Sequence, residues 1–589
     1  MDLLRIAKKY ALVNAVLHNG KANPDAVIKK IVIENPAIRN DLKDPEKRNF
    51  IKETILKVVS EINRLSIEDQ EKILKKEFNL SVEELLEAKS KKTRVGLPPL
   101  PDADKYTKIV TRFAPAPSGA LHIGQFLRAA YLSYIYARKY NGEFVLRVED
   151  TDPKRIKKIY YKWIQEDLKA MGLHWDKLVY ESDHFDLYYK LARELFLKGR
   201  AYICTCSTEE FSKYKEQKKS CPHREKLDKV EDWDKLVNGE YQFRSAVIRL
   251  KTDMKHINPA LRDPPIMRLI KNVPHPRTGY KYTLYALYNF ACVIEDHMLN
   301  ITHVIRAKEH QTNEDIQKEI YQAFGWQLPT FIEYGMIKLP GMKIHKRYIR
   351  NALRQGDLSG WEDIRLPTLR ALLRRGIHPE ALKKLAEHVG MTKNDIEVSL
   401  ETLYTFNRQI LSPIAKRISF VKEPYRIIIS EIEEPIEVKM DWIPGNPKAG
   451  KRYYRLLPVE ENGKKSIEVF ISKDDLSVIH NAMKSEDIIR LKELGNIQVI
   501  NISEQEKTIE AKLHSRKVIP GISKIHWVPG EDLYIPAIVN MPDGSKIKGL
   551  IELEAQKLEK GDYIQMERFG FGRIDANEGE IIIIAYAHP

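Results

Sequence analysis

One short stretch of the chain, residues 108–150, constrains the fold more than any other. KIVTRFA has the pattern of a strand, PAPSG that of a turn, LHIGQFLRAAYLSYIYARKY that of a helix and EFVLRVED that of a second strand. Strand, helix and strand in this order form a βαβ unit, and such units build parallel sheets that bind ligands at the carboxyl ends of their strands. We therefore expect a nucleotide-binding α/β domain.

The sequence on either side divides into segments of different character. Helical periodicity precedes the α/β segment and ends in a linker that contains prolines. The α/β pattern is interrupted and resumes, and short strands separated by turn residues fill the last part of the chain, which favours one or two β-barrels. The predicted segments are 1–104 (helical extension and linker), 105–183 and 283–345 (two halves of the α/β domain), 184–282 (an insertion), 346–415 (helical) and 416–589 (β-barrels).

The charge balance favours a polyanionic partner. The chain has 589 residues, 43% apolar and 31% charged, which excludes a mainly disordered or fibrous protein. Lys and Arg number 98 and Asp and Glu 82, so the net charge is +16. An excess of this size points to nucleic acid first. Lysine enrichment as an adaptation of solubility or thermal stability stays open as the alternative.

Neither a membrane span nor a secretion signal is visible. No run of about 18 apolar residues is present, and the first residues, MDLLRIAKKYALVNAV, lack the shape of a signal peptide. We therefore expect a cytoplasmic protein with no membrane partner.

A cluster of metal-ligand residues lies inside the predicted insertion. Cys204, Cys206 and Cys221 are three of only four cysteines, and His223 follows them closely. In a reducing compartment such clustering favours a metal over a disulfide, and three sulfurs with one imidazole supply the four ligands of a structural zinc ion. The alternative is a set of reduced, unligated cysteines in a basic surface loop.

The segment PAPSGALHIGQ, residues 115–125, is the first candidate binding site. Gly119 and Gly124 let the backbone approach a ligand closely, and the helix that begins near Gly124 presents N–H groups and its positive dipole end to phosphates. His122 stands where an imidazole would contact such a phosphate. Alone, one histidine before a helix is more often a surface or capping residue.

The segment LPGMKIHKR, residues 339–347, is the second candidate. Lys343, Lys346 and Arg347 can neutralise the charge that develops on a triphosphate attacked at its α-phosphorus. Taken alone, a solvated basic loop in a basic protein explains the pattern equally well.

Together the two segments match the HIGH and KMSKS signatures of class I aminoacyl-tRNA synthetases. RFAPAPSGALHIG, FVLRVEDTDPKR, VIEDHMLNITHVIRAKEH and GWEDIRLPTLRALLRRGI narrow the resemblance to glutamyl-tRNA synthetases of the archaeal type, a branch similar to the glutaminyl enzymes. The likeness spans about residue 105 to the C-terminus. Gln125 and His345 depart from the signatures, where histidine and serine are common, and Ala116 replaces a hydroxyl residue of bacterial relatives.

The resemblance implies a multidomain α/β plus all-β protein. Its parts would be a class I Rossmann-like catalytic domain split by an acceptor-stem-binding insertion, a helical connecting domain, C-terminal anticodon-binding β-barrels and an N-terminal helical extension. The implied reaction joins L-glutamate to ATP, supplied with Mg²⁺, and transfers the glutamyl group from its adenylate to the 3′ end of tRNA(Glu), with or without tRNA(Gln). A monomer is expected. A similar Cys/His arrangement in part of the family supports structural Zn²⁺.

The resemblance also assigns roles to single residues. His122, Gly124 and Lys346 would act in catalysis and, with Gln125 and Lys343, bind ATP. Arg112, Glu149, Tyr288 and Arg306 would bind the amino acid, with Glu149 on the ammonium group. Cys292 aligns with an asparagine of bacterial relatives; we expect it to pack in the core, and a place lining the pocket as a small apolar residue is the alternative.

Two arginines favour glutamate as the amino acid. Glutamate carries two carboxylates, and each favours a forked guanidinium, for which Arg112 and Arg306 are the candidates. In glutamine-specific relatives the position of Arg306 is not basic. A glutaminyl-tRNA synthetase is therefore disfavoured but remains an alternative, as does a catalytically weakened paralogue that only binds tRNA.

Overall fold

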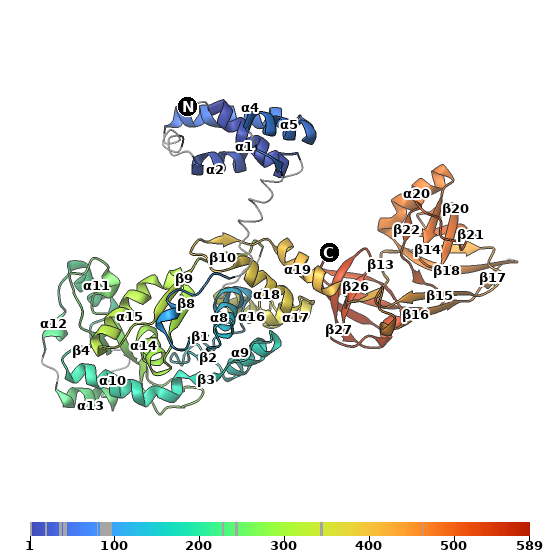
Figure 1. Cartoon of the computed structure of the whole chain (residues 1–589). Helices are drawn as coiled ribbons and strands as arrows, with labels where there is room; N and C mark the ends of the chain where they lie inside the picture. The colour runs from blue at the N-terminus through green and yellow to red at the C-terminus, as the bar shows by residue number, and fades with distance from the viewer. Residues whose placement is uncertain are drawn as a thin grey trace. The chain divides into compact units, whose positions relative to one another are not determined.

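The structure, a computed structural model, describes residues 3–17, 20–34, 38, 44–78, 80–82, 97–226, 229–238, 240–241, 246–341, 346–461 and 463–589. The chain separates into two compact units, Met1–Leu97 and Pro98–Pro589 (Figure 1). Within the described ranges, no helix has both the length and the apolar character that crossing a membrane requires.

The first unit is a small helical body with its own core. One face of its first helix carries alanines at a spacing of four, Ala7, Ala11 and Ala15, all fully buried. The buried Gln70 side chain donates to the carbonyls of Gly20 and Ile62, both at 2.9 Å. Its helices are α1 (Leu3–Leu17), α2 (Pro24–Glu34), α4 (Pro45–Ile62) and α5 (Ile67–Phe78).

The second unit is built around a parallel sheet of five strands in the order β3-β2-β1-β8-β9. The order in which the chain adds strands reverses between β1 and β8: β2 and β3 extend the sheet on the β1 side, and β9 extends it on the β8 side. Ligands bind at the carboxyl ends of the strands beside such a point. The strands are β1 (Val110–Phe113), β2 (Glu143–Val148), β3 (Lys177–Tyr180), β8 (His303–Ala307) and β9 (Thr330–Tyr334), and the associated helices are α7 (Ile123–Gln125), α8 (Tyr131–Lys139), α9 (Lys158–Ala170), α14 (Tyr288–Met298) and α15 (Gln311–Phe324).

An inserted body lies between β3 and β8 in the sequence. It consists of an antiparallel sheet in the order β4-β5-β6-β7 and flanking helices, and its last strand leads directly into α14. Helices α10 to α13 and strand β4 are labelled in Figure 1. Its core continues onto α14 and α15, through residues such as Phe290 and Ile320. Its elements are α10 (Phe185–Leu197), β4 (Ala201–Cys204), α11 (Thr208–Gln217), α12 (Pro222–Glu225), α13 (Val230–Val237), β5 (Val247–Leu250), β6 (Pro265–Leu269) and β7 (Leu284–Ala286).

A helical region follows the sheet and holds the turn that contains His122. Leu369 donates its backbone N–H to the Leu121 carbonyl at 2.9 Å, and Ile123 donates to the Pro367 carbonyl at 3.0 Å. The region contains β10 (Ile337–Lys338), α16 (Lys346–Gln355), α17 (Leu369–Arg375), α18 (Pro379–Val389), β11 (Ile396–Glu397) and α19 (Leu400–Leu411), with β10 and β11 paired in parallel.

Gly119 has a clear role in this packing. A Cβ atom at Gly119 would lie 2.3 Å from the Trp361 ring, whose side chain is buried against the turn. The space that the missing side chain leaves is therefore filled by the indole.

The last part of the chain forms two large, mostly antiparallel sheets. One has the order β12-β26-β27-β28-β24-β25-β13 and the other β17-β18-β14-β21-β20-β19-β22, and each has its own apolar core. The buried Arg452 and Glu552 pair and so join a hairpin to the first sheet. Arg374 on α17 forms a forked pair with Asp575 at 2.8 and 2.6 Å, which connects this sheet to the helical region.

These strands have the following bounds: β12 (Lys416–Ile418), β13 (Phe420–Lys422), β24 (Tyr534–Asn540), β25 (Lys546–Glu552), β26 (Tyr563–Met566), β27 (Gly570–Asn577) and β28 (Ile582–His588) in the first sheet; β14 (Pro424–Ser430), β17 (Val459–Glu461), β18 (Lys464–Ser472), β19 (Ile488–Leu491), β20 (Gly495–Ser503), β21 (Thr508–Ser515), β22 (Lys524–Ile525) and β23 (Val528–Pro529) in the second; and β15 (Ile436–Asp441) with β16 (Lys451–Leu456) in the hairpin. Helix α20 (Leu476–Ser485) packs on β20.

Candidate active site

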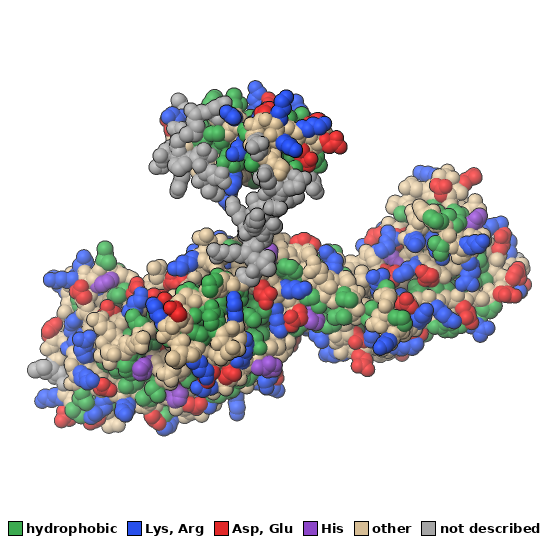
Figure 2. Space-filling model, in the orientation of Figure 1, with side chains coloured by type: hydrophobic (Ala, Val, Ile, Leu, Met, Phe, Trp, Pro, Cys, Tyr) green, Lys and Arg blue, Asp and Glu red, His purple; other side chains and the backbone are tan. Residues whose placement is uncertain are grey.

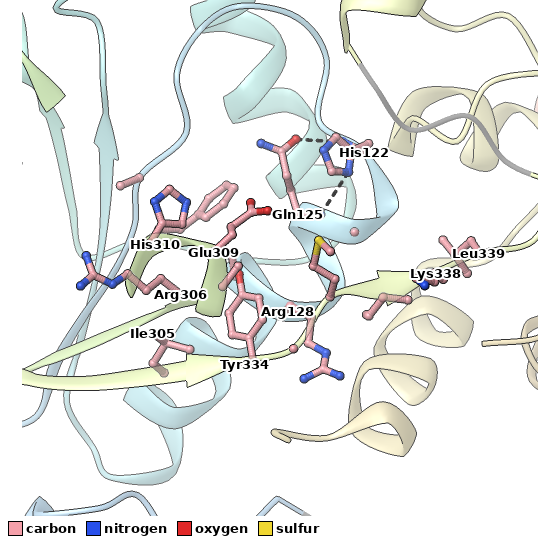
Figure 3. Close-up of a pocket in the computed structure, with 18 of the residues that line it drawn as sticks. His122, Gln125, Arg128, Ile305, Arg306, Glu309, His310, Tyr334, Lys338 and Leu339 are labelled. Atoms are coloured by element: carbon pink, nitrogen blue, oxygen red, sulfur yellow. Dashed lines mark hydrogen bonds between the residues drawn. The ribbon is translucent and has the colours of Figure 1, made fainter. Parts of the chain in front are cut away.

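A cavity of about 1110 Å³ opens at the carboxyl ends of β1 and β8 (Figure 3). Its size suits a nucleotide or another ligand of similar volume. Eight residues predicted for the site line it together: Arg112, His122, Gly124, Gln125, Glu149, Tyr288, Arg306 and Lys346. Lys343 and His345, which were also singled out, lie outside the described residues.

His122 caps the helix that begins beside the cavity. Its Nδ1 accepts a hydrogen bond from the Gln125 backbone N–H at 3.2 Å, and the Gln125 side-chain oxygen accepts from the His122 backbone N–H at 3.3 Å (Figure 3). A neutral imidazole whose Nδ1 accepts carries its proton on Nε2. His122 therefore caps the helix, which was the alternative to a ligand-binding role. Its Nε2–H is also a hydrogen-bond donor at the N-terminus of that helix.

The absence of a side chain at Gly124 leaves room for the His122 imidazole. A Cβ atom at Gly124 would lie 3.3 Å from Nδ1 and 3.4 Å from Cε1 of His122, closer than most side-chain contacts. The five residues that follow Gln125, Phe126–Ala130, form a π-helical turn, a feature often found at functional sites. Arg128 in that turn lines the cavity, donates to the Thr392 carbonyl at 3.2 Å and lies over the Tyr334 ring.

Lys346 brings a cation to the same cavity from the first turn of α16. Burial and the nearby Arg350 guanidinium lower the pKa of Lys346 to about 8. The side chain is therefore positively charged below about pH 8, and an anion bound beside it would favour that charge.

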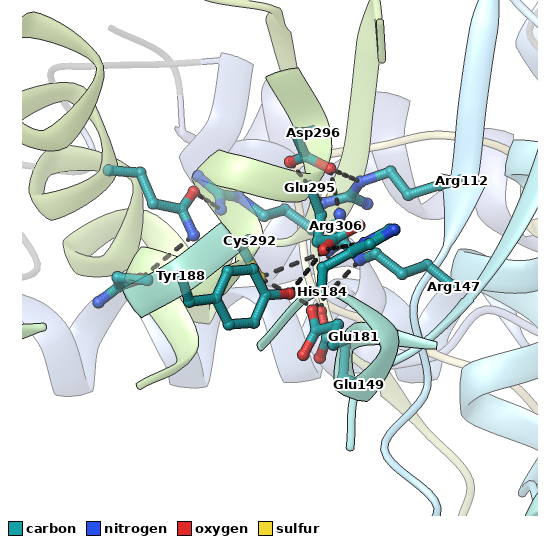
Figure 4. Close-up of polar contacts among 12 residues, drawn as sticks. Arg112, Arg147, Glu149, Glu181, His184, Tyr188, Cys292, Glu295, Asp296 and Arg306 are labelled. Atoms are coloured by element: carbon teal, nitrogen blue, oxygen red, sulfur yellow. Dashed lines mark hydrogen bonds and ion pairs between the residues drawn. The ribbon is translucent and has the colours of Figure 1, made fainter. Parts of the chain in front are cut away.

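The side chain of Arg112 is held by an acid on helix α14, Asp296. Its Nε donates to Asp296 Oδ1 at 3.0 Å, and its Nη2 lies 3.5 Å from Asp296 Oδ2 (Figure 4). Both side chains are buried, at 6% and 3% exposure. Asp296 thus occupies the Nε edge of the guanidinium, and Arg112 also lines the cavity.

Arg147, which sequence reasoning missed, links Arg112 to Glu149. The fully buried guanidinium lies 2.5 Å from Asp296 and 3.0 Å from Glu149, and 3.5 Å from a further buried acid, Glu181 (Figure 4). Burial and the Glu149 charge raise the pKa of Glu181. Arg147 and Asp296 stand in RVED and VIED, beside predicted residues, but only the fold shows that they meet.

Cys292 is buried, and its polar contacts are with charged residues of the site. Its thiol donates to Glu149 Oε1 at 3.2 Å, and its sulfur lies 3.5 Å from Arg147 Nη2. Tyr288, one turn earlier on α14, lines the cavity with its ring 5.7 Å from that of His310.

Arg306 reaches the cavity from β8 and is held by α15. Its Nη1 donates to Gln317 at 2.7 Å and its Nη2 to Glu314 at 3.2 Å, while the guanidinium lies 4.7 Å above the Phe331 ring. The guanidinium has five N–H donors, of which these bonds use two and the Nε–H is buried without a partner among the described residues, so one N–H remains on each of Nη1 and Nη2. Arg306 is therefore poised to bind an anion in the cavity.

The predicted metal ligands converge at one point of the inserted body. The sulfurs of Cys204 and Cys221 are 4.0 Å apart, and Nδ1 of His223 lies 3.3 Å from Cys206 and 4.0 Å from Cys221. Tetrahedral zinc with Zn–S bonds of about 2.3 Å requires sulfurs about 3.8 Å apart. The residues therefore fit zinc.

The surroundings of this cluster also suit a metal. Nε2 of His223 lies 2.7 Å from the Thr205 hydroxyl, a partner of the kind that orients ligating imidazoles. Cys204 and Cys221 are buried, and the Tyr202 hydroxyl lies 3.6 Å from Cys221.

Comparisons with known proteins agree with this architecture. Residues 108–413 match the family model "tRNA synthetases class I (E and Q), catalytic domain", and residues 415–516 and 524–575 match the two anti-codon binding domains of the same group. The β-rich end of the chain therefore corresponds to anticodon-binding domains.

Full-length relatives give the same result. The chain is 44% identical to a glutamate–tRNA ligase of Pyrococcus furiosus and 43% identical to one of Pyrococcus abyssi. Each alignment covers 100% of this chain and 100% of the relative. It is 38% identical to a glutamate–tRNA ligase of Methanocaldococcus jannaschii, over 98% of each chain. The resemblance seen in the sequence is confirmed: the chain belongs to the E and Q family of class I tRNA synthetases, among archaeal relatives named glutamate–tRNA ligase.

Proposed function

We propose that the protein is a glutamate–tRNA ligase, which activates L-glutamate with ATP and transfers it to the 3′ end of tRNA(Glu). The observation that carries this proposal is one cavity that brings Arg112, Arg306 and Glu149 together beside His122 and Lys346, in a lining that also includes Arg128, Glu309 and Glu397. Glutamate presents two carboxylates and one ammonium group, which this set complements.

The two arginines divide the carboxylates of the substrate between them. Arg306, held by α15, binds the side-chain carboxylate, because it is the position that is not basic in glutamine-specific relatives. Arg112, which lines the same cavity, binds the other carboxylate. Glu149 receives the ammonium group, and its orientation is set by Arg147 and Cys292.

The ATP end of the cavity lies between the His122 turn and α16. The Nε2–H of His122 and the first turn of its helix donate to the phosphates, and Lys346 neutralises charge as pyrophosphate leaves the α-phosphorus. Mg²⁺ accompanies ATP as its usual counter-ion. Gln125 keeps an amide group to donate, although its oxygen is engaged with the His122 backbone. Catalysis rests on positioning and charge, and no covalent enzyme intermediate forms.

The finer division of labour is part of the proposal. The inserted body binds the acceptor stem, the two C-terminal sheets read the anticodon, and the enzyme acts as a monomer. Lys and Arg side chains are spread over the visible face of the second unit, with Asp and Glu among them (Figure 2). This distribution of charge singles out no residue as a tRNA contact. Whether tRNA(Gln) is also charged is decided by the aminoacylation experiment below.

Zinc completes the proposal for the inserted body. Cys204, Cys206, Cys221 and His223 would hold one Zn²⁺, which bridges the end of β4 to the start of α12. Four protein ligands fill a tetrahedral shell, so the ion would be structural.

Aminoacylation of separately transcribed tRNAs tests the function. With labelled glutamate, we expect charging of tRNA(Glu), and labelled glutamine should give none on either tRNA. Glutamate on both tRNAs would identify a non-discriminating enzyme. Transfer of glutamine would favour the glutaminyl alternative, and absence of any transfer would favour the paralogue that only binds tRNA.

The charge of Lys346 should appear in the pH profile. Because its pKa lies near 8, kcat/KM for ATP should fall above about pH 8 as the free enzyme loses this charge. Lys346→Arg should abolish that fall, and Lys346→Ala should slow adenylate formation about 100-fold or more in a folded protein. Pyrophosphate exchange in the presence of tRNA(Glu) measures both; an unchanged rate in Lys346→Ala would assign this role to another cation.

Metal analysis tests the zinc site. Protein purified without chelators should contain one zinc per chain, and Cys206→Ala together with His223→Ala should contain none. Loss of the metal should destabilise the inserted body, visible as a lower unfolding temperature, because metal binding energy is folding energy. Cys292→Ala, which leaves the cluster intact, is the control; zinc-free wild-type protein would refute the assignment.

A further inference from the structure

A chain of side-chain hydrogen bonds starts at Arg306 and returns to the same cavity. Arg306 Nη1 donates to Gln317 Oε1 at 2.7 Å, and Gln317 Nε2 donates to Asn289 Oδ1 at 3.2 Å. Asn289 Nδ2 then donates to Asn313 Oδ1 at 3.1 Å, and Asn313 Nδ2 lies 3.1 Å from His310 Nδ1. Arg306 and His310 lie on the same side of the pocket (Figure 3).

The first member of the chain fixes the direction of all the others. A guanidinium can only donate, so Gln317 must turn its oxygen to Arg306 and its nitrogen to Asn289. Each amide then repeats this choice for the next one. The last amide presents an N–H to His310, whose Nδ1 must accept, so the imidazole is neutral with its proton on Nε2. Burial and the Arg306 charge lower the pKa of His310, which agrees.

The neutral amide at position 317 stands beside an acid. Glu314, one turn earlier on α15, already accepts from Arg306 at 3.2 Å, and its other oxygen lies 2.8 Å from Lys318. One carboxylate, shared with a lysine, thus faces the guanidinium from this helix. A second carboxylate at position 317, which is 2% exposed, would pair with Arg306 without competition from water.

We propose that Gln317 is a positioning residue for glutamate specificity: its neutral amide holds Arg306 in place while leaving the guanidinium charge for the side-chain carboxylate of the substrate. The inference rests on the proposed function and on the role given there to Arg306. It requires that position 317 carry an acceptor without a charge. The amide chain to His310 keeps that acceptor turned the right way.

Four variants separate this role from a structural one. Gln317→Glu adds the competing charge, and Gln317→Met removes the acceptor at similar volume. Gln317→Glu combined with Glu314→Gln exchanges the two groups and restores one carboxylate beside Arg306. Gln322→Glu, on an exposed position of the same helix, is the matched control for added charge. Aminoacylation of tRNA(Glu) gives KM for glutamate and for ATP with each variant, and thermal unfolding shows which variants are folded.

We expect Gln317→Glu to raise KM for glutamate more than 10-fold and Gln317→Met to raise it about 10-fold, the scale of one hydrogen bond to a charged group. KM for ATP should change less than about two-fold, and the exchanged pair should recover most of the loss. The Gln322→Glu control should match the wild type.

Several results would overturn the inference. An unchanged KM for glutamate in a folded Gln317→Glu variant would do so. If Gln317→Glu does not fold, an unchanged KM for glutamate in folded Gln317→Met would overturn the inference in the same way. Parallel rises for glutamate and ATP, or no recovery in the exchanged pair, would show a structural role. Wild-type protein that charges no tRNA with glutamate would instead remove the proposed function, and this inference with it.

Discussion

A buried arginine, Arg147, is the interaction on which the site depends. It is fully buried and pairs with Asp296 and Glu149, while Asp296 also holds Arg112. Strands β1 and β2 and helix α14 thereby share one ion network beneath the cavity. Removing one member of such a network would leave an uncompensated buried charge, which costs about 3–5 kcal/mol. The groups that we propose bind the substrate are therefore held in place by the protein itself.

The split of the catalytic domain explains how distant segments form this network. The chain leaves the sheet after β3, builds the inserted body and returns through β7 into α14, which carries Tyr288, Cys292 and Asp296. The inserted body thus sets where α14 enters the site. Arg306 is held by Glu314 on α15, an acid shared with Lys318, and by the neutral amide of Gln317. Arg112 and Arg306 are therefore both held by an acid that a second cation shares, and Arg306 has a neutral amide in addition.

Sequence reasoning found the residues whose signals are local. Short motifs predicted the turn and helix start around His122 and the charged residues beside the strand ends. These residues do line one cavity. It missed Arg147 and Asp296, because their roles arise from partners far away along the chain: Arg112 and Asp296 are 184 positions apart. It also missed Gln317, whose role appears only when strand β8 and helix α15 pack together. It also missed the packing of Gly119 against Trp361, since that neighbour comes from another region. Local patterns show which chemistry is present, whereas burial and long-range contacts decide how it is held.

A crystal structure of the protein with L-glutamate and a non-reacting ATP analogue would test the central claim most directly. The account predicts the ammonium group within hydrogen-bond distance of Glu149, the side-chain carboxylate on Arg306, the other carboxylate near Arg112, and the Arg147–Asp296 pair unchanged from the free protein. A substrate bound in the reverse sense, or a network that rearranges when the substrate binds, would contradict it.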